Sequence, residues 1–334
     1  MTTPEPDPQE SVFLSGELER AVLGAEPTLS AQDVAEDAGA TVEQARRLWR
    51  ALGFPERGGE VAFTPADARA MRTLLDLVDT ELIDFDTGIN LTRGVGQTMA
   101  RLADWEVSAL VQRIEELGGG ASAPAGSRSG SALRLVEQLN PSFERLLVYA
   151  WRRHLAAVVA RLEALGAAEE DLTSVDVTVG FADLVAFTSL TNDIDEDHLG
   201  DLVELFESRC HDVVTNHGGR VIKSLGDSVL FVHDEPIQGI ETAEGIIRVI
   251  GRDARMPDVR LGLATGQVVM RLGDVFGPPV NMAARLTNVA RRNRVIIDDT
   301  TAAALPPDQF ETRRLPARPV RGFGLVEPVA VRRH

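Results

Sequence analysis

The spacing of apolar residues divides the chain into two parts near residue 173. Before this point apolar residues recur every three or four positions, which predicts helices joined by short turns. After it, Val175, Val177, Val179 and Phe181 alternate with other residues, which predicts a strand. Strand-like and helical segments then follow one another to the end. The sequence therefore predicts an α+β protein whose first part is all-α.

The first part carries clear signals for helix starts. Ser30 with Asp33, and Thr41 with Gln44, have the spacing of an N-cap residue followed by a carboxyl or amide group three positions on. A short strand-like segment is expected at 61–63. Further helices are expected from residue 64, over 71–82 and over 99–117.

A change of composition separates the two parts. Residues 118–132 are rich in Gly, Ala and Ser, which predicts a flexible loop. Asn140-Pro141-Ser142 then resembles the cap of a long helix. One apolar stripe on this helix steps by four and three residues: Trp151, Leu155, Val158, Leu162 and Leu165. The stripe is either a dimer seam or a surface that docks on a domain. The expected boundaries are a helical domain at 1–140, a linker helix at 141–170 and a second domain at 171–334.

The second part predicts alternating strands and helices. Strands are expected near 175–181, 219–224, 229–233 and 258–264, and helices over 194–216 and 236–252. The order β-α-β-β-α-β is that of a ferredoxin-like palm. Later strands are expected near 267–272, 294–297 and 327–332.

Charge and composition narrow the functional classes. The formal net charge is −17, and both halves are acidic, so neither half offers the basic surface that non-specific nucleic-acid binding needs. No stretch reaches the ~18 apolar residues of a membrane span, and residues 1–10 do not resemble a secretory signal. A single cysteine, Cys210, excludes an intrachain disulfide. We therefore expect a cytoplasmic protein without a membrane span.

The basic residues are almost all arginine. Lys223 is the only lysine among the 34 Lys and Arg residues. A GC-rich genome explains most of this imbalance, because it replaces lysine codons by arginine codons. Lys223 is nevertheless a candidate for a role that arginine cannot fill.

Two aspartates are placed for metal binding. Asp183 follows an apolar strand and precedes a turn into a helix, and Asp227 lies at the tip of the hairpin Leu225-Gly226-Asp227. Adjacent strands would bring these carboxylates together, as a pair of Mg²⁺ ions on a triphosphate requires. Backbone N–H groups at the helix start could bind phosphate. Alternatively, Asp183 caps a helix and Gly226-Asp227 only forms a turn.

A third segment, 273–285, adds polar groups on a helix. Asn281 and Arg285 are spaced i, i+4 and share one helix face. An amide beside a guanidinium can position a ribose and stabilise charge on a phosphate. By itself, the pair would also suit an ordinary solvated face.

Together the three segments resemble the catalytic domain of class III nucleotide cyclases, specifically adenylyl cyclases, over residues 172–334. The resemblance implies that Asp183 and Asp227, with the backbone of Leu184, bind the metal ions. It implies that Lys223 and Asp274 recognise adenine.

The resemblance also implies roles around the phosphates. Asn281 and Arg285 look like the pair that stabilises the transition state. Arg260 looks like the arginine on the polyphosphate, and Phe187–Thr188 also belong to the substrate site. Arg321 stands where such enzymes often carry a phosphate-binding lysine, and arginine also binds phosphate well.

The implied reaction is attack of the ribose 3′-oxygen of ATP on the α-phosphorus, which gives 3′,5′-cyclic AMP and pyrophosphate. Two Mg²⁺ or Mn²⁺ ions per site would assist it. No histidine or glutamate is indicated as general base. In this family the site forms between two catalytic domains, so one such domain per chain implies a head-to-tail homodimer with shared active sites.

The first part also carries a resemblance. Residues 28–70 resemble a MerR-like winged helix-turn-helix, in which Arg46, Arg47 and Arg50 could face DNA; the acidic charge favours an interaction domain instead. The arrangement resembles the helical regulatory domain of autoinhibited actinobacterial adenylyl cyclases, some of which respond to pH. His154 on the linker helix is either a pH sensor or an ordinary exposed residue.

Two other functions remain open at this point. A DNA-binding regulator could sense a nucleotide without turnover. A diguanylate cyclase shares the palm fold, but the hairpin reads Leu225-Gly226-Asp227-Ser228 rather than its Gly-Gly-Asp/Glu-Glu-Phe signature.

Overall fold

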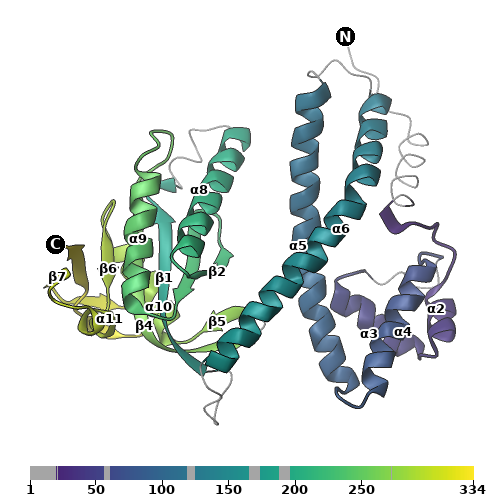
Figure 1. The fold of residues 1–334 in the computed structure, drawn as a ribbon, viewed down its shortest axis with the longest axis horizontal. Helices are drawn as coiled ribbons and strands as arrows, with labels where there is room; N and C mark the ends of the chain where they lie inside the picture. The colour runs from purple at the N-terminus through teal and green to yellow at the C-terminus, as the bar shows by residue number, and fades with distance from the viewer. Residues whose placement is uncertain are drawn as a thin grey trace. The chain divides into compact units, whose positions relative to one another are not determined.

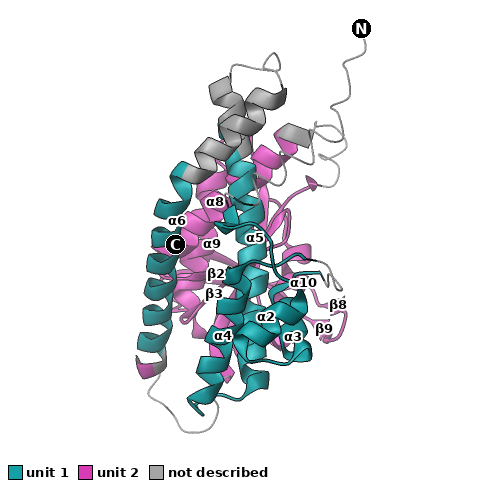
Figure 2. Cartoon of the chain, turned by 90° about the vertical axis from the view of Figure 1, so that its right-hand side faces the viewer, with its two compact units in different colours: residues 1–161 teal, residues 162–334 magenta. Residues whose placement is uncertain are grey.

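The computed structural model describes residues 20, 22–55, 61–118, 125–164, 174–187, 196–271 and 273–334. The chain forms two compact units, an N-terminal unit, Met1–Arg161, and a C-terminal unit, Leu162–His334 (Figure 2). The two are described separately.

The N-terminal unit is built from helices. They are α2 (Ala31–Ala38), α3 (Val42–Leu52), α4 (Pro65–Asp79), α5 (Phe85–Gly118) and α6 (Ala125–Ala164). Reciprocal capping boxes at Ser30 and Thr41 confirm the predicted helix starts. The expected strand at 61–63 is a single bridge, Leu29 with Phe63. Trp49 stacks on the Phe63 ring at 3.9 Å, so this bridge belongs to the core that α2, α3 and α4 share.

The linker region differs from the prediction. Part of the loop expected at 118–132 is helical, because α6 begins at Ala125, and Pro141 lies inside α6 instead of at its start. Residues 119–124 lie outside the described part. The prediction gave more weight to the Gly and Ser residues of 118–132 than to the good helix formers at the end of this stretch and after it, such as Ala132, Leu133 and Arg134. Proline removes one backbone donor but does not end this helix.

The apolar stripe of α6 is uncovered within the N-terminal unit. Trp151 is 62% exposed, and Leu155 and Val158 are also exposed. The side chains of Leu162 and Leu165 lie outside the described residues. His154 is exposed on the same helix.

The C-terminal unit is an α+β domain. Its elements are β1 (Ser174–Leu184), α8 (Glu196–Asn216), β2 (Arg220–Ser224), β3 (Ser228–His233), α9 (Pro236–Ile250), β4 (Val259–Arg271), β5 (Asp274–Phe276), α10 (Pro278–Val289), β6 (Val295–Ile297), α11 (Asp299–Ala304), β7 (Phe310–Arg314), β8 (Arg318–Val320), β9 (Gly324–Val326) and β10 (Val329–Arg333).

The central sheet has the order β2-β3-β1-β4-β6-β10-β7, with β5 paired to β4. Its first four strands are antiparallel neighbours, which is the predicted ferredoxin-like arrangement. The strands expected at 258–264 and 267–272 are one continuous strand, β4, because Gly266 stays paired with Val177 of β1 instead of forming a turn. The prediction missed β5 and β7–β9, which are short.

Helices cover the two faces of the sheet differently (Figure 1). Apolar residues of α8 and α9, such as Phe206 and Ile246, pack with Leu261 and Leu263 on one face. On the other face α10 lies directly on β4. A Cβ at Gly262 would come within 2.2 Å of the Thr287 backbone nitrogen, so glycine is needed for this close approach. The rest of this second face carries the candidate site.

Candidate active site

The carboxylate of Asp183 lies at the end of the central strand β1. Its register partners are Ser228 on β3 and Arg260 on β4. The Ser228 hydroxyl donates a hydrogen bond to Asp183 Oδ1. The Arg260 guanidinium binds Asp183 Oδ2, with Nε at 2.7 Å and the terminal nitrogen at 2.6 Å. Both neighbouring strands therefore fix this carboxylate.

Asp227 lies beside this carboxylate at the hairpin tip. Gly226 has a φ of 67°, which the tight turn requires, and Leu184 N–H donates to the Asp227 carbonyl at 2.9 Å. Burial, and then the negative charge of Asp183, raise the pKa of the Asp227 carboxyl, and Arg260 partly opposes this rise. The structure thus brings the two predicted carboxylates together.

A pair of close carboxylates fits a divalent cation. Carboxylate oxygens are hard donors, and a cation would relieve the repulsion that raises the pKa of Asp227. Within the described residues no group of three or more His, Cys, Asp and Glu side chains could hold a metal ion. Backbone, water or substrate oxygens would therefore have to complete the coordination.

Lys223 reaches the site through a bulge that the sequence did not reveal. Val221 pairs with Phe231, but Lys223 pairs with Leu230, so β2 carries one extra residue, Ile222. A one-residue shift turns a side chain to the opposite face. The bulge therefore moves Lys223 from the face under α8 and α9 to the face that carries Asp183.

On this face Lys223 meets its predicted partner. Its Nζ lies 2.5 Å from Oδ2 of Asp274, the first residue of β5, and both side chains are about one-third exposed. Burial acts to raise the pKa of Asp274, but the hydrogen bonds from Lys223 and from the Val275 backbone N–H, together with the charge of Lys223, outweigh it, and the pKa is lowered. A charged donor and a charged acceptor thus lie side by side.

The α10 pair is exposed to solvent. Asn281 and Arg285 lie on α10, and neither forms a hydrogen bond or ion pair with another described residue. Arg321 is in the exposed turn between β8 and β9. The structure does not bring these three residues into contact with Asp183 or Lys223.

The remaining predicted residues lie close to β1. Leu184 is its last residue, and Phe187 packs against the core under α8 and α9. Thr188 lies outside the described residues. The prediction missed Ser228, although its position directly after Asp227 in the strand-forming run 228–233 offered a signal.

Comparison with known proteins identifies this arrangement. The family model described as "Adenylate and Guanylate cyclase catalytic domain" matches residues 171–331. An adenylate cyclase of Streptomyces coelicolor is 37% identical to this chain and covers 97% of it, while the chain covers 92% of that protein. An adenylate cyclase of Streptomyces griseus is 35% identical, with coverages of 93% and 87%. A "pH-sensitive adenylate cyclase" of Mycobacterium tuberculosis is 29% identical, with coverages of 94% and 81%.

The fold and the paired carboxylates define a nucleotide cyclase catalytic domain. The similarity extends over nearly the whole chain, N-terminal unit included. The chain therefore belongs to the class III adenylyl cyclases.

Proposed function

We propose that this protein converts ATP to 3′,5′-cyclic AMP and pyrophosphate. The observation that carries this function is the position of Asp183 and Asp227 on the same sheet face as the Lys223–Asp274 pair. The first pair suits a metal-bound triphosphate, and the second suits adenine. The full-length similarity to adenylate cyclases supports the same assignment.

The metal side would be formed by Asp183, Asp227 and the backbone of Leu184, with two Mg²⁺ or Mn²⁺ ions per site. When bound, such ions neutralise the triphosphate and lower the pKa of the ribose 3′-hydroxyl. Arg260, which now neutralises Asp183, would be free to bind a phosphate oxygen once a cation replaces it on the carboxylate. Ser228 keeps the Asp183 carboxylate in position during this exchange.

The base side would be formed by Lys223 and Asp274. Lys223 Nζ can donate to adenine N1, and Asp274 can accept from the N6 amine. Guanine presents a carbonyl and an N–H at the same edge and would leave both protein groups mismatched. An unsatisfied buried polar group costs ~1–3 kcal/mol, which corresponds to about 10- to 100-fold discrimination.

The transition-state side would be formed by Asn281 and Arg285. Asn281 would orient the ribose, and Arg285 would stabilise charge on the phosphate during attack of the 3′-oxygen. Arg321 and Phe187–Thr188 complete the substrate site in this proposal. Because no histidine or glutamate is indicated as general base, the proton of the 3′-hydroxyl would pass to water or to the substrate itself.

In this proposal the active site is shared across a head-to-tail homodimer. One protomer would supply the metal carboxylates, and its partner would supply the base-reading and transition-state residues. Asn281 and Arg285 are exposed and have no partner among the described residues, as expected for groups that act on substrate held by another copy. The uncovered stripe of α6 offers a further surface for this association.

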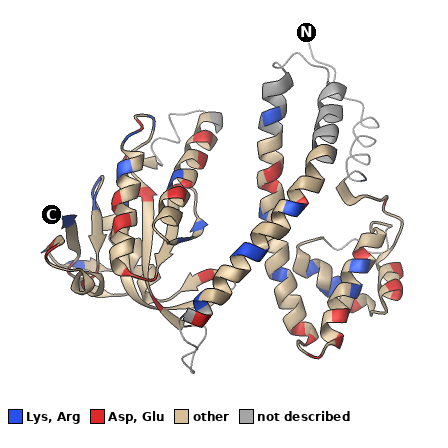
Figure 3. Ribbon diagram, viewed as in Figure 1, with Lys and Arg blue, Asp and Glu red and all other residues tan. Residues whose placement is uncertain are grey.

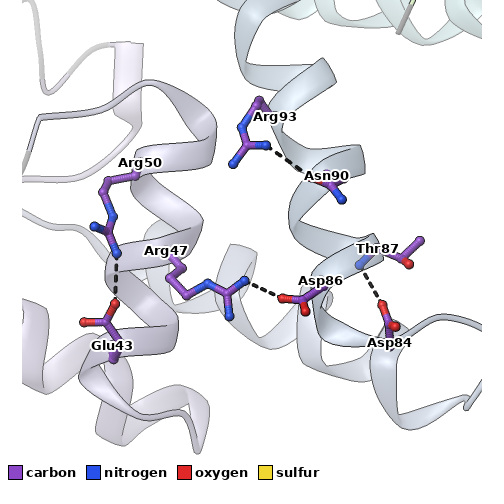
Figure 4. Close-up of polar contacts among 8 residues, drawn as sticks. All are labelled: Glu43, Arg47, Arg50, Asp84, Asp86, Thr87, Asn90 and Arg93. Carbon is purple, nitrogen blue, oxygen red and sulfur yellow. Dashed lines mark hydrogen bonds and ion pairs between the residues drawn. The ribbon is translucent and has the colours of Figure 1, made fainter. Parts of the chain in front are cut away.

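The N-terminal unit would regulate the enzyme, with α6 as the connection between regulatory and catalytic parts. The boundaries 1–140, 141–170 and 171–334 and the MerR-like motif at 28–70 belong to this proposal. Arg47 binds Asp86 and Arg50 binds Glu43, so these arginines already have acidic partners (Figure 4). Acidic and basic residues are interspersed on these helices (Figure 3). A DNA-binding regulator is therefore not favoured.

None of the described helices is long and apolar enough to cross a membrane.

The decisive experiment measures cyclic AMP and cyclic GMP production by the full chain with Mg²⁺ and with Mn²⁺. We expect metal-dependent cyclisation of ATP and much slower turnover of GTP. Asp183→Asn is the control, since it removes a metal carboxylate while keeping its shape. Metal-independent product formation, or a preference for GTP, would contradict the proposal.

A further inference from the structure

The turn between α10 and β6 places a group of arginines next to the candidate active site. Arg291, Arg292 and Arg294 in this turn line an open cavity of about 530 Å³ together with Arg260, Val185 and Ala290. This volume falls within the ~300–1,000 Å³ of small-molecule sites. Arg260 is the residue that also contacts Asp183, so the cavity adjoins the metal side.

The turn is fixed on the start of β4. Asn293 has a φ of 53°, a left-handed conformation that asparagine tolerates. Its backbone N–H donates to the Val259 carbonyl at 2.7 Å, and its side-chain amide donates to Asp258 Oδ1 at 2.7 Å. The arginines on either side of Asn293 are therefore held beside Arg260.

The four guanidinium groups differ in their neutralisation. Arg260 binds Asp183, and Arg292 lies 3.7 Å from Asp258 Oδ2. Arg291 and Arg294 are exposed and have no carboxylate partner within the described ranges. No carboxylate side chain is among the residues that line the cavity. The cavity thus carries an excess of positive charge and suits an anion with several oxygens.

We propose that Arg291 and Arg294 extend the phosphate-binding surface beyond Arg260, so that this cavity holds the β- and γ-phosphates of ATP and the released pyrophosphate. The inference rests on the proposed function and extends it to Arg291 and Arg294. Arg260 would contact the group next to the metal carboxylates, and Arg291 and Arg294 would contact its outer oxygens. Bidentate guanidinium–phosphate bonds supply the affinity.

The test uses the full chain with Arg291→Gln and Arg294→Gln combined. The matched control combines Arg313→Gln with Arg318→Gln, which removes the same charge from exposed positions on β7 and β8. Calorimetric titration with sodium pyrophosphate, in the absence of divalent cations, gives the Kd. We expect the Kd to rise about 10- to 100-fold in the cavity variant and less than about 3-fold in the control.

Steady-state kinetics identify the source of the pyrophosphate group. A raised Ki for pyrophosphate with an unchanged KM for ATP assigns the cavity to the product, and a rise in both assigns it to substrate as well. Equal pyrophosphate affinity in the cavity variant and the control overturns the inference. If the parent cyclises ATP in that case, the proposed function stands. If the parent instead binds pyrophosphate through Arg291 and Arg294 but forms no cyclic AMP, the cavity assignment stands and the proposed function falls.

Discussion

Two ion pairs, one from each unit, are built from the same chemical groups but lie in different surroundings. In the C-terminal unit the side chains of Asp183 and Arg260 are 15% and 29% exposed. In the N-terminal unit those of Asp86 and Arg47 are 74% and 38% exposed (Figure 4). Half-buried charges lose hydration that their pairing only partly replaces, whereas exposed pairs lose little and contribute little.

The difference in exposure indicates which charged pairs have a role beyond stabilising the fold. A pair that is costly to desolvate is a poor way to stabilise a fold, so its position at the end of β1 favours a role toward a ligand. The pairs on α3 and α5 need no such explanation. If the comparison is correct, substitutions at the buried and half-buried charged or titratable groups of the C-terminal unit should change activity or pH behaviour, and substitutions at the exposed ion pair of the N-terminal unit should change little.

The largest effect is expected from breaking the active site in two different places. Asp183→Asn removes a metal ligand, and Arg285→Ala removes the transition-state charge, so each variant should lose at least about 10³-fold in cyclic AMP production. A mixture of the two should recover up to about one quarter of the parental activity, because half of randomly formed dimers are mixed and each has one intact site of two. The rate is measured after co-refolding or co-expression.

Size-exclusion or crosslinking measurements on the same mixture provide the control. If mixed dimers form but remain inactive, the shared-site proposal is wrong. If Asp183→Asn alone retains parental activity, the contrast between half-buried and exposed pairs also fails.

The second largest effect concerns a buried histidine in the C-terminal unit. His233 is 1% exposed, its Nε2 bonds Thr242 Oγ1 at 2.8 Å, and its Nδ1 has no partner within the described part of the chain. Burial, followed by the nearby His217, lowers the pKa of His233 from 6.5 to about 4. At pH values between these two pKa values, His233 binds a proton in the unfolded chain but not in the folded chain. The free energy of unfolding should therefore fall as the pH falls, by about 1.4 kcal/mol per pH unit and roughly 3 kcal/mol in all.

Hydrogen exchange of β3 amides in the full chain measures this free energy at several pH values. His233→Gln should flatten the pH dependence, since glutamine does not titrate. The matched control is His154→Ala in the exposed face of α6, which should leave the profile unchanged. An unaltered profile in His233→Gln would show that another group controls acid stability.

An intermediate effect is expected from exchanging the base-reading pair. Lys223→Glu with Asp274→Cys should lower ATP turnover about 10- to 100-fold and admit GTP, because the hydrogen-bonding groups that face the base are replaced. The ratio of cyclic AMP to cyclic GMP is the measurement. The metal requirement should stay as in the parent, which separates base reading from the metal side. Parental ATP turnover in this variant would disprove the assignment of Lys223 and Asp274.

The smallest effect is expected on the surface of the N-terminal unit. A double-mutant cycle of Arg47→Ala and Asp86→Ala should give a coupling of only about 0.2–1 kcal/mol. Thermal unfolding followed by tryptophan fluorescence measures it, because Trp49 lies in the nearby core and responds to its unfolding. A coupling several times larger would mean that exposure does not separate the two classes of ion pair.

Local sequence patterns predicted much of this architecture. Alternation along β1 and the caps at Ser30 and Thr41 depend on neighbouring residues only, and the structure has them where expected. The predicted start of α6 was wrong, because the prediction gave more weight to a Gly/Ser-rich stretch and to Pro141 than to the helix-forming residues between them. Short strands such as β8 and β9 escaped prediction, since three residues carry too little periodicity.

The sequence alone determined which residue types are available and in what order: two carboxylates near strand ends, one lysine, and Asn281 with Arg285 on one helix face. Tertiary structure decided how they meet. The bulge in β2 sets the face on which Lys223 lies, and the register of β1 with β4 gives Asp183 its arginine. The turn at Asn293 places Arg291 and Arg294 beside Arg260. These contacts depend on hydrogen bonds between strands far apart in the chain, which residue spacing does not encode.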